Sequence, residues 1–287
     1  MNLPFYISNV FAESAWGGNP LAIVPLLDGQ SLDTATMQRI ARQFNLSETV
    51  FITPPTATNH TPNHAAHLRI FTPEHEMPFA GHPTIGAAQW LHSHLNLSDT
   101  FTLTTPAKTA TITHENGVHR FALSGYESAP CSFSRAHLAQ ALGLDLGDVA
   151  HGYQWMNTGT WQLIVPLTSR EAVMRAKPVN ARALFDDGVQ ASHINAYLWH
   201  ENNGAVTSRY FFSLNGQTFS EDPGTGSACA NLGAWAHEAG FAPVSWKITQ
   251  AEAIERPNHL YLNVSEEGTI QVGGRVMPFA HGELRAF

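Results

Sequence analysis

The sequence predicts an α+β protein built from two related halves. The chain has 287 residues, above the size at which one hydrophobic core usually stops growing. The tetrapeptide IVPL at residues 23–26 recurs at residues 164–167, an offset of 141 residues. Each half also alternates short β-rich segments with helical patterns. These observations favour a duplicated domain.

Further residue pairs share nearly the same offset. Phe71 and Phe212, Thr84 and Thr225, and Ala87 and Ala228 are 141 positions apart, and Arg69 and Arg209 are 140 apart. An offset near half the chain length is what an ancient duplication leaves.

In the first half, strands are expected at residues 4–11, 20–26 and 68–72, which are rich in β-branched and aromatic types or alternate with period two. Residues 109–113 and 118–123 flank an Asn116-Gly117 turn, a strong hairpin signal. Apolar residues at helical spacing predict helices over 32–44 and 85–91.

The second half repeats this pattern. Strands are expected near 153–156, 161–167, 194–199, 206–213, 260–264 and 269–273. A long helix is expected over 226–238, ended by Gly240, and a shorter one over 134–142, ended by Gly143. The boundary falls near 125–133, which gives an N-terminal half of residues 1–127 and a C-terminal half of 128–287. Residues 276–287 are expected to return to the first half as a strand.

Composition excludes several classes of function. Apolar residues make up 43% of the chain, enough for real cores, while the net charge is −8 and no basic run occurs, which argues against nucleic acid partners. The N-terminus lacks the features of a signal peptide and no segment is apolar enough to span a membrane, so a cytoplasmic protein without a membrane partner is expected. Cys131 and Cys229 lie 98 positions apart, and neither a disulfide framework nor a zinc site is predicted.

Two loops of small residues precede the two main helices at repeat-related positions, 78–84 and 221–227. Exposed N–H groups and the helix dipole favour an anion such as a carboxylate at such places. Thr225 and Ser227 are also ordinary helix-capping residues, which is the simpler structural interpretation. The duplication, with His82 and Asp222 at the helix starts, favours an active site in a cleft between the halves.

Glu48 follows a helix and enters an apolar strand, where desolvation would raise the pKa of a carboxyl group and suit it to general acid–base work. The alternative is a solvated charge at a strand end. Asn19 is either a polar group near the ligand or a turn former.

The remaining candidates are set aside. His60, His64 and His67 have a spacing that could suit a metal, but they lie in a Pro- and Asn-rich loop without a nearby Cys or carboxylate, so no metal is expected there. Cys229 lies roughly 200° around the helix from Ser227 and is expected to pack as a small hydrophobe. The HExxH, P-loop lysine and GxSxG motifs are absent from the sequence.

At these residues the sequence closely resembles the phenazine-biosynthesis PhzF-like family, which shares the diaminopimelate epimerase fold. The resemblance spans essentially the full chain. It rests on Gly18-Asn19-Pro20, on 37–42 leading to 45–48, on 69–73 with 78–83, and on 221–223 with 225–228.

The resemblance implies that each half is a mostly antiparallel sheet wrapped around a central helix, in a homodimer. It implies a cofactor-independent isomerase that transfers a proton on a small carboxylate-bearing substrate, without metal. The implied catalytic residues are Glu48, His82, Asp222 and Ser227, with Glu48 as the proton-transferring carboxylate. The candidate substrate-binding residues are Asn19, Gly81, Thr84, Gly224, Thr225 and Gly226.

Two departures concern the substrate. Family members commonly have proline after the Phe-Ser of the second half, where this chain has Leu214, and Ala-Thr-Gly before the serine, where it has 224–226 as Gly-Thr-Gly. Two rival functions stay open. An epimerase or racemase of the two-thiol type would need a cysteine at each helix start, where this chain has His82 and Ser227. A non-catalytic binding or regulatory protein could keep the fold without turnover.

Overall fold

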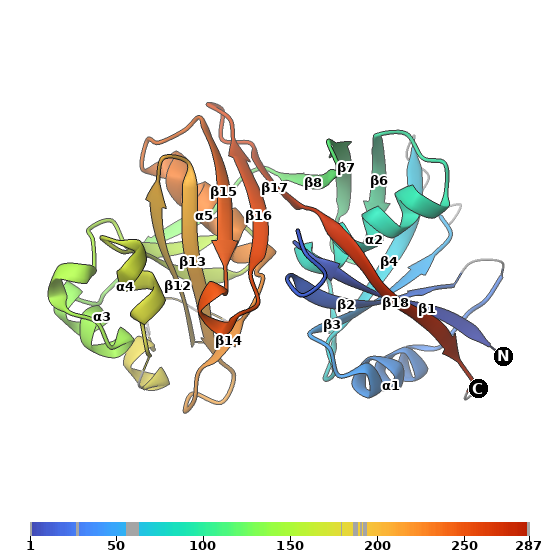
Figure 1. The fold of residues 1–287 in the computed structure, drawn as a ribbon, viewed down its shortest axis with the longest axis horizontal. Helices are drawn as coiled ribbons and strands as arrows, with labels where there is room; N and C mark the ends of the chain where they lie inside the picture. Colours follow the sequence, from blue (N-terminus) through green and yellow to red (C-terminus); the bar gives the residue numbers. More distant parts are fainter. Residues whose placement is uncertain are drawn as a thin grey trace. The chain divides into compact units, whose positions relative to one another are not determined.

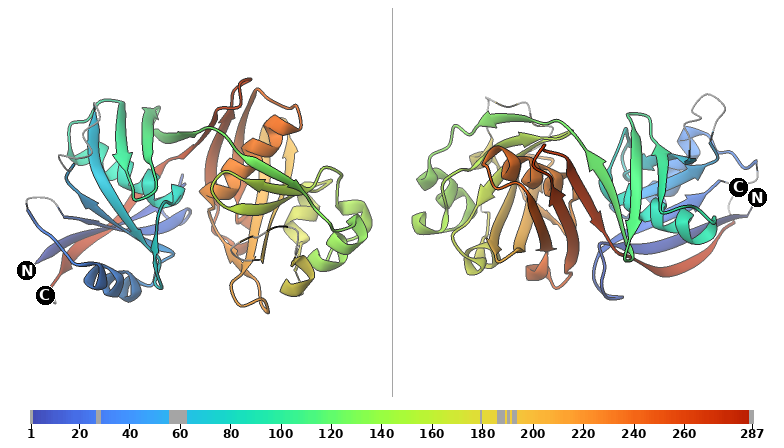
Figure 2. Two further views of the ribbon diagram at one scale, coloured as in Figure 1. Left: turned by 180° about the vertical axis from the view of Figure 1, so that it is seen from behind. Right: turned by 90° about the horizontal axis from the view of Figure 1, so that it is seen from above.

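The chain folds into two compact units in the computed structural model, which describes residues 2–26, 29–55, 63–178, 180–185, 189, 191 and 194–285. Unit 1 comprises Met1–Ala122 together with Gly273–Phe287, and unit 2 comprises Leu123–Val272. Figure 1 labels their elements and Figure 2 shows each unit from two further sides. Each unit is a separate α+β body.

Unit 1 contains a mixed, mostly antiparallel sheet. Its strands are β1 Leu3–Val10, β2 Asn19–Pro25, β3 Glu48–Thr53, β4 His64–Phe71, β5 Glu76–Met77, β6 Thr100–Thr104, β7 Thr109–Glu115, β8 Val118–Leu123 and β18 Val276–Leu284. Their pairings give the order β18-β1-β2-β3-β4-β6-β7-β8, with β5 beside the end of β4. The β2–β3 and β4–β6 pairs are parallel and the others antiparallel.

Two helices pack against this sheet. Helix α1 (Thr34–Phe44) begins at Asp33, whose side chain accepts a hydrogen bond from the Thr36 N–H, and ends at Asn45 in the left-handed conformation. It packs on β3 and β4, while α2 (Gly81–His94) packs on β1 to β4. Nearly every residue of α2 from its start to Leu91 is buried, which marks it as a central helix.

The two helices lie on opposite faces of the sheet. Val24 of β2 joins the apolar cluster around α1, whereas Leu21 of the same strand contacts α2 at Gly86. Because successive side chains of a strand point to opposite faces, these contacts separate the α1 layer from the α2 layer.

Unit 2 repeats the arrangement. Its strands are β9 Glu127–Pro130, β10 Gln154–Asn157, β11 Trp161–Pro166, β12 Ile194–Asn202, β13 Ala205–Ser213, β14 Ser220–Asp222, β15 Val244–Gln250, β16 Asn258–Val264 and β17 Ile270–Gly274, the last of which leads out of the unit. The order is β9-β10-β11-β12-β13-β15-β16, with β14 beside β13. The β11–β12 and β13–β15 pairs are parallel.

The helices of unit 2 are α3 Arg135–Leu142, α4 Arg170–Arg175 and α5 Gly226–Glu238, with single 3₁₀ turns at Leu146–Asp148, Ala181–Leu184 and Glu252–Ile254. Gly143 ends α3, as the sequence predicts, while Ser134, expected as the first residue of the helix, caps it by accepting a hydrogen bond from the His137 N–H. Helix α5 has the predicted bounds and is buried along almost its whole length. It packs on β10, β11 and β16.

The two units share one topology, which confirms the predicted fold class. The series β1-β2-α1-β3-β4-β5-α2-β6-β7 matches β10-β11-α4-β12-β13-β14-α5-β15-β16 element by element. The repeated IVPL segments lie in and just after β2 and β11, each of which pairs in parallel with the strand that follows it. Residues 276–284 form β18, which pairs with β1 as β9 pairs with β10.

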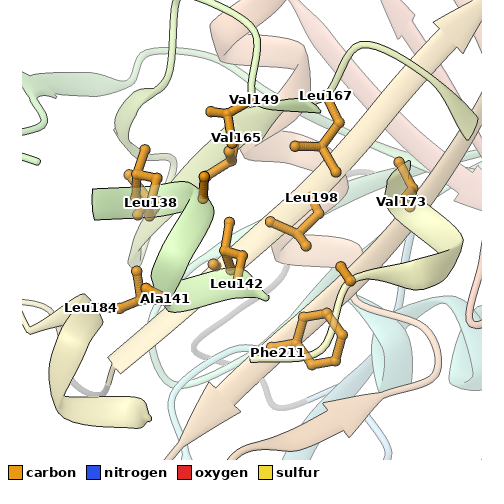
Figure 3. Packing of buried hydrophobic residues seen from close by; sticks show 14 of the residues in the cluster. Leu138, Ala141, Leu142, Val149, Val165, Leu167, Val173, Leu184, Leu198 and Phe211 are labelled. Atoms are coloured by element: carbon orange, nitrogen blue, oxygen red, sulfur yellow. The ribbon is translucent and has the colours of Figure 1, made fainter. Parts of the chain in front are cut away.

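The core of unit 2 on the face opposite α5 contains a large apolar cluster. Leu138 and Leu142 of α3 and Val173 of α4 meet Val165, Leu198 and Phe211 of the sheet, as Figure 3 shows. In the described part of the chain, no helix combines the length and the apolar character needed to cross a membrane.

Candidate active site

Glu48 is the first residue of β3. Helix α1 ends just before it at Asn45, whose φ of 52° turns the chain back towards the sheet. Thr49 to Ile52, which follow, are fully buried. The Glu48 side chain itself is 18% exposed, so the carboxylate lies at the edge of an apolar strand, as the sequence predicts.

His82 fixes this carboxylate. It is the second residue of α2, and its side chain is 5% exposed. Its Nδ1 lies 2.8 Å from Oε2 of Glu48, and its Nε2 lies 3.1 Å from the backbone carbonyl oxygen of Asn19. The ring is thus held at both nitrogens, in contact with β2 and β3.

These two contacts determine how many protons the pair holds. A carbonyl oxygen can only accept, so Nε2 of His82 donates to Asn19. The Nδ1–Oε2 hydrogen bond then contains a single proton. Either a histidinium donates to the Glu48 carboxylate, or a protonated Glu48 donates to a neutral imidazole. Both forms have the same proton count, so the pair can begin a reaction as a base or as an acid.

The start of α2 offers backbone donors beside this pair. Ala80 occupies the N-cap position, and no side chain caps α2 in the part of the chain that the structure describes. Pro83 has no N–H. Thr84 donates two hydrogen bonds to the Ala80 carbonyl oxygen, one from its N–H at 3.3 Å and one from its hydroxyl at 2.7 Å. The N–H groups of Gly81 and His82 are therefore the donors presented at this helix start.

A cation lies near the same loop. Nζ of Lys108 is 4.3 Å from the ring centre of Phe79, which precedes α2 by two residues. Burial lowers the pKa of Lys108. No pattern in the sequence predicts this contact.

The start of α5 is organised around Gln250 of β15. Gln250 is fully buried, and its Nε2 donates to the Asp222 carbonyl oxygen at 2.8 Å and to the Thr225 hydroxyl at 2.9 Å. Its Oε1 accepts from the Thr225 N–H at 3.2 Å. The Thr225 hydroxyl in turn donates to Oδ2 of Asp222. Thr225 occupies the N-cap position without side-chain capping, so capping does not explain this loop. Gly224 and Gly226 flank it and are buried.

Ser227 belongs to a second polar network. Its Oγ accepts from Nε2 of Gln162 at 3.0 Å, and Oε1 of Gln162 accepts from Nδ2 of Asn231 at 2.7 Å. Oδ1 of Asn231 accepts from the N–H and the hydroxyl of Thr158, each at 2.8 Å. Because Ser227 accepts here, its own hydroxyl proton is available to another partner.

The structure thus brings the predicted residues into two groups. Glu48, His82 and Asn19 are in direct contact in unit 1, and Asp222 and Thr225 are in direct contact in unit 2. The cleft expected from the sequence stays a prediction. Gln250 and Gln162 were not predicted.

Other sequence candidates have separate surroundings. Nε2 of His64 and Nδ1 of His67 lie 3.1 and 3.0 Å from Oγ1 of Thr104, while His60 is outside the described residues. Cys229 is fully buried, and burial raises the pKa of its thiol, which agrees with the predicted packing role.

Comparisons with known proteins give consistent results. The family model of the phenazine biosynthesis-like proteins (PhzC-PhzF) matches residues 8–282. The chain is 44% identical to an uncharacterized isomerase of Pasteurella multocida over 281 residues, covering 98% of this chain and 93% of that protein. It is 31% identical to the trans-2,3-dihydro-3-hydroxyanthranilate isomerase of Pseudomonas fluorescens, with 98% of each chain covered. Among solved structures, a PhzF-family protein of Bacillus anthracis superposes with a TM-score of 0.84 at 24% identity, over the full length of both chains.

Proposed function

The chain belongs to the phenazine biosynthesis-like family and is an isomerase, and we propose that it shifts a proton between two carbons of a small carboxylate-bearing substrate. Glu48 is the proton carrier in this proposal. The observation that supports it most directly is the contact of 2.8 Å between Oε2 of Glu48 and Nδ1 of His82.

An isomerase of this kind needs one group that removes a proton and returns it. With His82 protonated, the Glu48 carboxylate accepts the proton from a substrate carbon, and the electrons of the broken C–H bond delocalise into the conjugated system of the substrate. Glu48 then gives the proton back to a different carbon. The site returns to its starting state, so the cycle is balanced with no other reactant.

His82 supports this cycle by its position. Its Nδ1, 2.8 Å from Oε2 of Glu48, fixes the orientation of that carboxyl group, and the Asn19 carbonyl keeps the His82 ring from rotating. His82 also brings its own N–H, next to that of Gly81, to the start of α2. A substrate carboxylate bound at these donors would lie beside the carboxyl group that moves the proton.

In unit 2, we propose that the loop of Gly224, Thr225 and Gly226 binds substrate and that Asp222 and Ser227 assist the reaction. The support is the order of this loop: Gln250 fixes both Asp222 and Thr225, and Gln162 fixes Ser227. Rigid polar groups of this kind are typical of sites that orient a ligand.

The two cysteines of this chain are not placed to act as the acid–base thiols of a two-thiol epimerase. Cys229 is buried inside α5 with a thiol whose pKa burial raises, and Cys131 lies between β9 and α3 rather than at a helix start. A carboxylate and a histidine are the acid–base groups that the site offers instead.

The test is proton exchange in deuterated buffer across a panel of small carboxylates, beginning with trans-2,3-dihydro-3-hydroxyanthranilate because a relative is named for that substrate. Deuterium is expected at a substrate carbon with the wild-type protein. Glu48→Gln should lower the rate about 10²- to 10⁴-fold while binding is kept.

Glu74→Gln, the same change at an exposed residue of unit 1, is the matched control. Wild-type exchange by Glu48→Gln would overturn the assignment of Glu48. Tight binding without exchange in any protein would indicate the non-catalytic alternative.

A further inference from the structure

Three histidines converge in unit 1 at a place that the proton-transfer chemistry does not use. His92 lies in the last turn of α2, His114 near the end of β7, and His119 near the start of β8. One ring nitrogen from each lies within 4.8 Å of the others. His82 and His92 are ten residues apart on α2, about 15 Å along the helix axis, so this cluster is distinct from the Glu48–His82 pair.

The β7–β8 hairpin places two of these residues opposite each other. Asn116 and Gly117 have φ values of 52° and 76°, as a two-residue turn with both central residues in the left-handed region requires. In the resulting register, His114 pairs directly with His119. The third histidine, His92, comes from the end of α2 and lies close to both.

The spacing of the rings suits one metal ion. The ring centres of His92 and His114 are 4.4 Å apart, those of His114 and His119 are 4.5 Å apart, and those of His92 and His119 are 5.3 Å apart. Three imidazoles that bind one tetrahedral ion through Zn–N bonds of about 2.0 Å have ring centres ~5 Å apart. The distances between the ring centres are therefore close to those of a three-histidine site.

Of the three histidines, His119 is the one whose ring makes no hydrogen bond to the described residues. It is 3% exposed, and neither ring nitrogen has a hydrogen-bond partner among the described residues. Leaving a buried polar group unsatisfied costs about 1–3 kcal/mol, so such groups usually have a bound partner.

Asp99 completes the surroundings. Its Oδ1 accepts a hydrogen bond from Nδ1 of His114 at 3.0 Å and lies 3.8 Å from Nε2 of His92. Its side chain is 76% exposed, so the cluster opens to solvent on this side. A carboxylate that orients a ligating histidine is a common partner of protein metal sites.

We propose that His92, His114 and His119 form a binding site for Zn²⁺ or another divalent metal that prefers imidazole ligands, with Asp99 as the positioning carboxylate. Three histidines leave a fourth position for water. The ion would join the end of α2 to the β7–β8 hairpin, so its effect would be on the stability of unit 1 rather than on proton transfer.

The experiment measures binding of Zn²⁺ to the full-length protein after treatment with a chelator, by calorimetry and by the melting temperature. A single tight equivalent is expected, with a rise in melting temperature. Co²⁺ should give the visible absorption bands of a tetrahedral nitrogen site. His92→Gln and His114→Gln, whose side chains are each 22% exposed, should abolish the tight equivalent, and Asp99→Asn should weaken it about 10- to 100-fold.

His75→Gln, a change at an exposed histidine of the same unit, is the control and should bind as the wild type does. Binding that His92→Gln and His114→Gln leave unchanged, or several weak equivalents without the cobalt bands, would mean adventitious metal only and would overturn the proposal. Because the readouts are affinity, melting temperature and an absorption spectrum, the result is independent of whether a substrate has been found.

Discussion

Arg209 holds Glu221 in a bidentate ion pair, with Nε 3.0 Å from Oε1 and Nη2 2.7 Å from Oε2. Both side chains are 9% exposed. The third guanidinium nitrogen, Nη1, donates to backbone carbonyls at the end of α4, the shortest distance being 2.8 Å to Ala176. The duplicated counterpart, Arg69 with Glu76, has the same pairing but is more exposed, at 23% and 27%.

This difference in burial predicts unequal costs of breaking the two pairs. Glu221→Gln should lower the free energy of unfolding by about 3 kcal/mol, because it leaves the Arg209 charge buried without a counterion. Glu76→Gln should cost about 1 kcal/mol or less, since water reaches its partner. Urea unfolding followed by circular dichroism measures both. Equal losses would show that burial does not control the strength of these pairs.

Gln250 is predicted to order the loop at the start of α5. Gln250→Ala removes the partners of the Thr225 N–H and of the Asp222 carbonyl, which should cost about 1–3 kcal/mol. Amide hydrogen exchange at Thr225 should accelerate together with this loss. Ser245→Ala, at an exposed position of β15, is the control, because its hydroxyl donates to Asn263 of the neighbouring strand β16. Unchanged exchange at Thr225 would contradict the role given to Gln250.

The two thiols should differ in reactivity. Burial raises the pKa of Cys229, so the reactive thiolate is absent from the native protein at pH 8, whereas Cys131 is only half-buried. A thiol reagent should modify Cys131 first and Cys229 only after denaturation, as peptide mass spectrometry would show. The raised pKa also works against folding at high pH: above about pH 8.5 the unfolded chain releases the Cys229 proton and the folded chain does not, so native stability falls. Rapid labelling of Cys229 in the native protein would contradict the predicted difference in reactivity between the two thiols.

Close packing of the central helices predicts a cost for a single methyl group. A Cβ atom at Gly233 of α5 would lie 2.8 Å from Ile270 and 2.9 Å from Leu262, and one at Gly86 of α2 would lie 2.3 Å from Leu21. Alanine is normally the better helix former by about 1 kcal/mol. Overpacking of about 1–3 kcal/mol should nevertheless win, so that Gly233→Ala lowers the melting temperature.

Gly147→Ala is the matched control in unit 2, because a Cβ there meets no atom within 4 Å. It should leave the melting temperature nearly unchanged. If the Gly233→Ala protein were as stable as the wild type, the side chains of Ile270 and Leu262 would have to move aside at little cost in free energy.

The sequence predicted elements that carry their own local signals. The bounds of α5 at Gly226 and Glu238 follow from apolar spacing, and the end of α3 at Gly143 follows from glycine. The IVPL repeat identified β2 and β11 as equivalent strands, because the two copies occupy equivalent places in the packing of their units. No pattern predicts helix α4, because its six residues, Arg170–Arg175, are too few for a helical period to show.

The contacts that build the candidate site were harder to predict. Glu48 and His82 are 34 residues apart, and their contact depends on the β2–β3 pairing and on the packing of α2, which no local pattern specifies. Gln250 did carry a signal: it continues the period-two alternation of Trp246 and Ile248, all three of which are buried. A polar residue at a core position of a strand indicates a buried network.

The histidine cluster lies between these cases. The Asn116-Gly117 turn alone implies that His114 faces His119, because a two-residue turn fixes the hairpin register. His92 comes from a helix that precedes the hairpin, so the third member required the tertiary structure. Spacing along the chain drew attention to His60, His64 and His67 instead.

The last prediction concerns the shared proton of Glu48 and His82. If the two residues act as one unit, their effects on turnover should not add. Glu48→Gln should already remove proton transfer, and His82→Gln should lower turnover strongly because Glu48 loses its donor and its fixed orientation. The double variant should then be about as slow as Glu48→Gln alone, whereas independent residues would multiply their effects. Deuterium exchange rates of the four proteins under saturating substrate measure this coupling. The pairing of Glu74→Gln with His82→Gln supplies the control, since these changes are expected to multiply. Fully multiplicative losses for Glu48 and His82 would show that the contact of 2.8 Å is structural and that each residue serves the reaction separately.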